Sequence, residues 1–259
     1  MILESLNEQV KTENSNWIET CDSLTILIKQ IIATGRIDRG DVKRTALATL
    51  FCKIINSFFS ASILLRCGYA QDAGTIVRSL IEALFVMKAC HESAEYLDQY
   101  MRTDIKVLDK VHQKHSTYVE RMKIKGLMTD DDSLAHKDAH EKAMEVYEGQ
   151  SGVELNIARA AEVAKLQDMY DIIYIHLSTM NSHPSVRSLG SRMTLDDGGG
   201  LKEFNVGPDH KGVDWMFSIL IQPVIITLEC MDKELSIGIS SEIRASWESY
   251  NKAREALVS

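Results

Sequence analysis

The chain has 259 residues, of which 25% are charged, and a formal net charge of −8. This length suits one large domain or two small ones, and it allows a sizeable core. Only three prolines occur, and the abundant leucine, alanine, isoleucine, glutamate and lysine favour helix. The negative charge argues against non-specific binding to nucleic acid or to an anionic membrane as the main activity.

The five cysteines are an odd number, are widely spaced and form no C-x-x-C pair. Most of them stand among apolar residues, as reduced core cysteines do. The first residues lack the basic region and the apolar run of a secretory signal. We therefore expect a cytoplasmic protein with a single helical domain over residues 1–259, in which residues 1–15 are a candidate loose arm.

Apolar stripes with a period of 3.6 run along most of the chain and indicate helices. The stripes place the main helices at about residues 42–66, 70–92, 93–122, 154–180, 213–235 and 240–257. Short turns between long helices imply antiparallel neighbours. The stretches within 42–66 and 213–235 approach the length of a membrane span, but their internal polar residues favour buried helices. The predicted fold class is all-α, a multi-helix antiparallel bundle.

The period changes to two around the sequence DDGGG, with Met193 and Leu195 before it and Leu201 and Phe204 after it. A glycine run supplies the positive φ angles that a tight hairpin turn requires. The pattern predicts a small β-hairpin insertion near residues 192–206.

Residues 70–92 are apolar on most of the helical circumference, which is typical of a central helix in a bundle. Arg78 and Glu82 interrupt this surface and stand four residues apart, so they lie on one side of the helix. A charge inside such a segment is costly unless it is paired. Three interpretations stay open: a self-contained structural pair, a pair that lines a pocket completed by other residues, or a solvent-exposed face.

A second polar stretch, YIHLSTMNSHPSVR, covers residues 174–187. Tyr174 and Ser178 share a helical face, and we expect the helix to be interrupted just before His183. Because His183 precedes a proline, it is biased towards an extended conformation. These groups can line a polar site, or they can serve only in helix capping and turns.

The two polar stretches are expected to meet. A guanidinium carries five donors, which one carboxylate cannot accept by itself, so Arg78 and Glu82 need further partners. The densest cluster of suitable groups lies in the second stretch. We therefore expect Tyr174 and His183 to join the pair in one pocket, with residues 190–212 as its rim or lid.

Motifs for nucleotide binding, serine hydrolysis and zinc proteolysis are absent from the sequence. His112 and His115, and likewise His136 and His140, have spacings that suit metal ligands on a helix. Neither pair has an obvious third ligand, so we expect exposed helix histidines, no metal and no cofactor. The Arg-x4-His spacing of the HEPN ribonucleases is also absent, which disfavours a nuclease of that pattern.

Two short motifs carry a family resemblance: A-x4-R-S-L-x-E at residues 73–82 and Y-x3-S-x4-H-P-S at residues 174–185. Together they resemble a large bacterial family of all-helical proteins of unknown function, over roughly residues 45–235. The resemblance implies a helical fold and a polar centre made of Arg78, Glu82, Tyr174, Ser178 and His183. It brings no established activity, and a role in phage defence is an expectation from context only.

Two classes of function stay open, a ligand-binding protein and an enzyme, and a protein–protein adaptor is a third and simpler alternative. A ligand-binding or regulatory protein would use Arg78 to bind a small anionic ligand or a nucleotide through its carboxylate or phosphate. A hydrolase or nuclease would use His183 as general acid or base and Arg78 to stabilise negative charge, with Glu82 as a further catalytic candidate. A helical protein–protein adaptor would instead need an exposed apolar patch.

The predicted helices at 42–66 and 213–235 carry more apolar surface than one bundle layer easily covers. We therefore expect a homodimer that forms through one of them. Light scattering over a range of concentrations measures this directly, and a monomer at every concentration would contradict the expectation.

Overall fold

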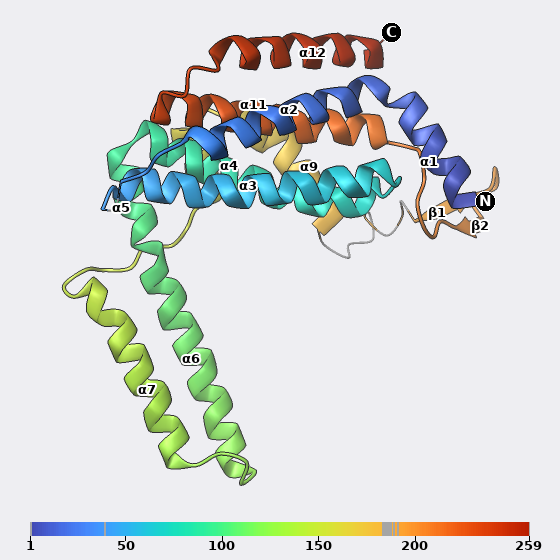
Figure 1. Cartoon of the computed structure of the whole chain (residues 1–259). Helices are drawn as coiled ribbons and strands as arrows, with labels where there is room; N and C mark the ends of the chain where they lie inside the picture. Colours follow the sequence, from blue (N-terminus) through green and yellow to red (C-terminus); the bar gives the residue numbers. More distant parts are fainter. Residues whose placement is uncertain (1, 39, 183–187, 189, 191, 259) are drawn as a thin grey trace. The chain divides into compact units, whose positions relative to one another are not determined.

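The computed structural model describes residues 2–38, 40–182, 188, 190 and 192–258 (Figure 1). The chain divides into two compact units, of which unit 1 is Met1–Glu92 with Ile157–Ser259 and unit 2 is Ser93–Asn156. Helices dominate both units, which confirms the all-α fold class. The single domain stays a prediction, because a division by contacts does not say how many parts fold independently.

Unit 1 contains six long helices: α1 (Ile2–Glu13), α2 (Ser15–Thr34), α3 (Val42–Arg66), α4 (Ala70–Glu92), α11 (Val213–Leu235) and α12 (Ser240–Val258). In Figure 1, α2 and α11 lie between α12 on one side and α3 with α4 on the other, and α11 contacts all four of these helices. Val10 of α1 is fully buried. The core of unit 1 therefore lies around α11 and α4.

Helix α4 is buried on most of its circumference, as the sequence predicts. It packs against α3, α11 and the short helix α8 (Ile157–Val163). Leu80, Ile81 and Leu84 have no exposed surface. The turn before α4 is tight because Gly68 has a φ of +80°, where a side chain would be strained, and its carbonyl accepts from the Asp209 amide at 2.9 Å.

Within the described residues, two helices, α3 and α11, are long and apolar enough to cross a membrane by length and composition alone. The most apolar stretch of α11 is 72% buried inside the structure, and that of α3 is 44% buried. A core helix of a globular protein passes the same test of length and composition. Of these two helices, α3 leaves more of its apolar surface uncovered, for example at Val42 and Ile63. Whether this surface forms a homodimer stays a prediction.

The helix expected over residues 154–180 is divided, which corrects the sequence-based prediction. Helix α8 ends early, and Lys165 takes the left-handed conformation with a φ of 58°, which a regular helix does not allow. The chain then forms the π-helical segment η2 (Met169–Tyr174), the short α9 (Ile175–Leu177) and the π-helical segment η3 (Ser178–Ser182). The structure therefore adds an interruption near Lys165, while the interruption expected just before His183 falls at the edge of the described residues.

The predicted hairpin is present and consists of β1 (Met193–Leu195) and β2 (Leu201–Phe204). The strands are antiparallel, with Met193 opposite Phe204 and an irregularity in the pairing after Thr194. The Asp196 carboxylate accepts from the amides of Gly198 and Gly200 at 2.9 and 2.8 Å. The turn is thus held by its own aspartate as well as by the glycine conformations.

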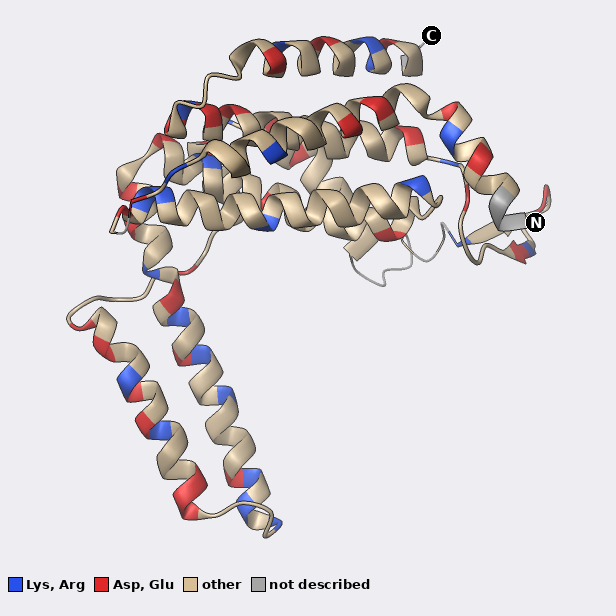
Figure 2. Ribbon diagram, in the orientation of Figure 1, with Lys and Arg blue, Asp and Glu red and all other residues tan. Residues whose placement is uncertain are grey.

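Unit 2 contains α5 (Ala94–Met101), α6 (Thr103–Ile124), α7 (Asp130–Met144) and the short η1 (Glu145–Tyr147). The single helix expected over 93–122 is therefore two helices, with the break at Arg102. Helix α7 begins at a capping box, in which Thr129 and Asp132 bond each other's backbone amides, and none of its residues is buried. Figure 2 shows acidic and basic residues interspersed along both α6 and α7, whereas α3 is mostly uncharged.

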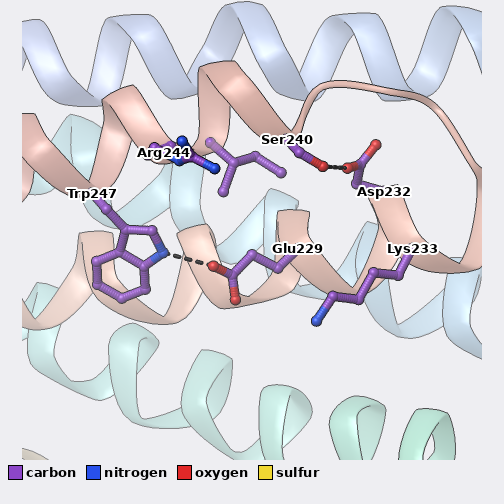
Figure 3. A pocket seen from close by; sticks show the side chains of 7 residues that line it. Glu229, Asp232, Lys233, Ser240, Arg244 and Trp247 are labelled. Carbon is purple, nitrogen blue, oxygen red and sulfur yellow. Dashed lines mark hydrogen bonds between the residues drawn. The ribbon is translucent and has the colours of Figure 1, made fainter.

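The connection between α11 and α12 depends on Asp232, whose residue is only 6% exposed. One carboxylate oxygen accepts from the amides of Gly238 and Ile239 at 2.7 and 3.0 Å, and the other accepts from the Ser240 hydroxyl at 2.7 Å (Figure 3). Burial alone would raise the pKa of Asp232, but the hydrogen bonds from Ile239, Ser240 and Gly238 outweigh it and hold the pKa below its usual value.

Asp232→Ala should lower the free energy of unfolding by about 2 kcal/mol, because the buried Ile239 amide would lose its acceptor. Ser240→Ala removes one hydroxyl and should cost less. Urea denaturation measures both changes. The lowered pKa adds stability that is present above the usual aspartate pKa and is lost as pH falls through the lower folded-state value. The difference between wild type and Asp232→Ala should therefore shrink in acid, and a pH-independent difference would contradict this assignment.

Candidate functional site

The candidate site is built on α4, which carries Arg78 and Glu82 on one side. Their side chains are 24% and 26% exposed, and Arg78 Nη2 lies 2.9 Å from Glu82 Oε1. A pair of charges on so buried a helix requires further polar partners. Those partners come from η2 and η3, which both pack against α4.

Two hydroxyl groups complete the coordination of the guanidinium. Arg78 Nε donates to the Ser178 hydroxyl at 2.8 Å, and Nη2 donates to the Tyr174 hydroxyl at 2.9 Å. The Tyr174 hydroxyl in turn donates to Glu82 Oε1 at 2.6 Å. Arg78, Glu82 and Tyr174 therefore form a closed triangle of polar contacts, and Ser178 fixes the other edge of the guanidinium. The structure thus brings together four of the five residues that the sequence singles out.

Tyr174 also has packing contacts that fix its ring. Its ring lies edge-on to Phe85 with centroids 6.0 Å apart, and it stacks on Tyr170 at 5.1 Å. The Arg78 guanidinium carbon lies 5.0 Å from the centroid of the Tyr174 ring. Aromatic contacts of this kind and a cation over a ring face are both stabilising. The hydroxyl is therefore presented to the charged pair by a ring with little freedom to move.

The surroundings of the Tyr174 hydroxyl raise its pKa. Burial raises the pKa of its hydroxyl, and the neighbouring Glu82 carboxylate raises it further, while Arg78 acts in the opposite direction. A tyrosine hydroxyl is protonated at neutral pH in any case, as its donation to Glu82 requires, and the raised pKa extends that protonation to more alkaline pH. The raised pKa contributes stability that is present below the usual tyrosine value and is lost as pH rises through the higher folded-state value.

Contacts at the start of α4 fix the position of η3. Asn181 Nδ2 donates to the Gln71 carbonyl at 3.0 Å, and the Thr75 hydroxyl donates to the Asn181 carbonyl at 2.9 Å. Gly74 allows this close approach, because a Cβ at that position would lie 2.6 Å from Asn181 Cγ. Sequence reasoning placed Asn181 only in a helix break and missed this role, for which a glycine inside a helical pattern was the available signal.

The fifth predicted residue, His183, lies outside the described residues. The proposed rim at residues 190–212 is described in part. Arg192 Nη2 lies 3.5 Å from Asp72 Oδ1, and the Asp209 amide bonds the Gly68 carbonyl at 2.9 Å. Both contacts join this segment to the start of α4, and its role as a lid stays a prediction.

A separate cavity that the sequence did not reveal lies between α11 and α12 (Figure 3). It has a volume of about 320 Å³. Glu229, whose carboxylate accepts from the Trp247 indole at 2.7 Å, and the exposed cations Lys233 and Arg244 line this cavity. None of the residues predicted for the site lines it, so this cavity is distinct from the polar centre on α4.

The four histidines with metal-like spacings also come together, within unit 2. His112 and His115 on α6 face His136 and His140 on α7, with ring centroids of neighbouring rings 3.9 to 4.8 Å apart. Sequence spacing paired them within each helix, but only the packing of α6 on α7 shows that the pairs meet. Among the described residues, no group of three potential ligands is placed to hold a metal ion.

The fold and the site together define an all-α protein with an Arg–Tyr–Glu centre on a largely buried helix. Residues 44–201 match the model of a family of unknown function, DUF5677, and this range is more than half of the chain. The protein therefore belongs to this family, and the matched range includes the whole described polar centre. Comparison with curated proteins gives no match, and comparison with solved structures gives none.

Tyr174→Phe should destabilise the protein by about 1–3 kcal/mol, because both Arg78 and Glu82 would lose a hydrogen-bond partner in a partly buried place. Tyr170→Phe is the matched control. Its ring stacks in the same cluster, and the contacts described for Tyr170 are made by its ring. Chemical denaturation of the two variants gives the comparison, and equal losses of stability would show that the Tyr174 hydroxyl contributes nothing specific.

Gly74→Ala should also be destabilising, although alanine favours helix by about 1 kcal/mol. The new methyl group would overlap the Asn181 side chain and push η3 away from α4, and overpacking of this kind costs about 1–3 kcal/mol. The melting temperature should therefore fall, and the Gly74→Ala, Asn181→Ala double variant should recover part of the loss. An increase in melting temperature for Gly74→Ala alone would contradict the close approach.

Proposed function

We propose that the protein is a ligand-binding or regulatory protein whose site is the polar centre around Arg78. The observation that carries this proposal is a guanidinium that is held rigidly and yet remains 24% exposed. Its described contacts use Nε and Nη2, so Nη1 remains for a ligand. A preorganised guanidinium suits a carboxylate or a phosphate because its remaining Nη1 can donate charge-assisted hydrogen bonds from a fixed position.

The position of Glu82 restricts the class of ligand further. Both of its described contacts, from Arg78 and from Tyr174, reach the same oxygen, Oε1. The side chain is 26% exposed, so the second oxygen can accept from a ligand. The best match is a small anion that also carries a hydrogen-bond donor beside its negative group, as nucleotides and amino acids do. The donor would satisfy Glu82 while the anion contacts Arg78.

The other expectations have less support. A hydrolase or nuclease would need His183, which lies outside the described residues, and no described contact favours that chemistry. An adaptor would use exposed apolar residues such as Val42 and Ile63 on α3, and exposure of apolar side chains alone does not identify a partner. Within the proposal, we place the protein in the bacterial cytoplasm, and the suggested link to phage defence comes from resemblance alone.

Arg78→Lys tests the proposal, because lysine keeps the positive charge but loses the planar fork. Wild type is first screened with nucleotides and small organic acids by thermal shift, and the affinity of any ligand found is measured by calorimetry. The substitution should weaken binding at least tenfold, a loss of about 1.4 kcal/mol.

Arg66→Lys is the matched control. Arg66 lies on α3 and pairs with Asp22 through a 2.6 Å contact, so it is an arginine in an ion pair outside the polar centre. This variant should bind as wild type does. A ligand that binds Arg78→Lys and wild type equally would refute the proposed site. A loss in both variants would show that the effect is not specific to Arg78.

A further inference from the structure

Four imidazole rings form the contact between α6 and α7. His112 lies between two rings of α7, nearly parallel to both, with centroids 4.0 Å from His140 and 4.8 Å from His136. His115 contacts His136 at 3.9 Å. Since no residue of α7 is buried, little apolar packing holds this helix, and the histidine stack is a major part of its attachment.

The stack has little hydrogen bonding to stabilise protonated rings. His112 Nδ1 is buried and has no partner among the described residues. His136 Nε2 is 3.4 Å from the His112 carbonyl, which is a long contact. The His112 ring lies face to face with His136 and His140, the His115 ring is tilted against His136, and no metal-binding group is found among the described residues. The stack is therefore more stable with neutral imidazoles than with protonated ones.

Few charged groups face the four rings. On α6, Asp109 Oδ1 is 3.6 Å from His140 Nε2. On α7, Asp130 and Lys137 line a cavity of about 330 Å³ beside His112. Asp130 is already paired with Lys123 at 2.6 Å, and Lys137 is a cation. Asp109 is thus the one unpaired carboxylate described beside the stack, and it cannot balance several new positive charges.

We propose that the four-histidine stack is a proton-operated latch, which holds α7 against α6 while the rings are neutral and releases it when they are protonated. Protonation would place like charges on rings about 4 Å apart, where repulsion is strong. The release concerns the α6–α7 hairpin alone. It is independent of the ligand site proposed on α4, which lies in unit 1.

The direction of the pH effect follows from the state of His112. Burial lowers its pKa, and the neighbouring His140 and His136 lower it further, while Asp109 opposes them. A lowered folded-state pKa gives stability that is present above the usual histidine value of about 6.5 and is lost as pH falls through the folded-state value. The latch is therefore closed at neutral pH and opens in mild acid.

Hydrogen exchange of the full chain tests the latch, with each amide rate corrected for its intrinsic dependence on pH. Opening of α6 and α7 should stay nearly constant from pH 7.5 to about 6.5 and should then increase towards pH 5.5, by up to about tenfold per pH unit for each proton taken up. Amides of α4 and α11 should not follow this trend. In the double variant His112→Phe, His140→Phe, which keeps flat rings that cannot be protonated, the increase should be strongly reduced.

His210→Phe is the matched control. His210 lies in unit 1 against Glu13 at 3.2 Å, so this variant should retain the full response of the hairpin. Exchange in wild type that does not change with pH, or an equal increase in the double variant, would overturn the proposal.

Two further measurements do not depend on whether the double variant folds. In wild type, an NMR titration of the histidine ring signals should show at least one of the four stacked rings titrating below pH 6.5, and four ordinary or raised values would overturn the latch. Stoichiometric zinc chloride at pH 7.5 should leave exchange in α6 and α7 unchanged. Protection by zinc that depends on His112 would show that the cluster is a metal site instead.

Discussion

The structure of the polar centre depends on the presence of two opposite charges on α4, a helix that is buried on most of its circumference. A guanidinium and a carboxylate on such a helix lose much of their hydration, and one contact between them does not compensate for that loss. Tyr174 and Ser178 supply the remaining hydrogen bonds. Because both residues lie in the segment that follows α8, their hydrogen bonds to Arg78 and Glu82 help to fix that segment against α4, together with the contacts of Asn181.

The same constraint gives a reason for the unusual backbone of residues 169–182. Tyr174 must meet Arg78 while Asn181 meets Gln71, and both contacts fall on the side of the segment that faces α4. A π-helical turn has one more residue than an α-helical turn, which changes the residues that share a face. Such turns are frequent at functional sites, and here the altered spacing coincides with the side chains that hold the polar centre.

Sequence periodicity predicted the long helices α3, α4, α11 and α12 with almost their observed ends, because their apolar stripes are long and their caps are local. The unmet hydrogen bonds of Arg78 predicted Tyr174 and His183 as partners, and the family resemblance added Ser178. Tyr174 and Ser178 make these contacts, whereas His183 lies outside the described residues. Sequence periodicity did not predict the π-helical segments, since no simple period marks them, or the left-handed Lys165 that divides 154–180. Sequence periodicity also did not predict the histidine stack, because the pairing of α6 with α7 depends on tertiary packing.

The segment that connects η3 to α11 is attached near the start of α4 at both of its ends. Asn181 is bound to Gln71 and Thr75, and Asp209 is bound to Gly68, so both ends of this segment are attached within one short stretch at the start of α4. A loop whose ends are fixed close together can change in length at a small entropic cost. Homologous chains could therefore differ widely in this segment, and in what they present beside the site, while the four-residue polar centre stays unchanged.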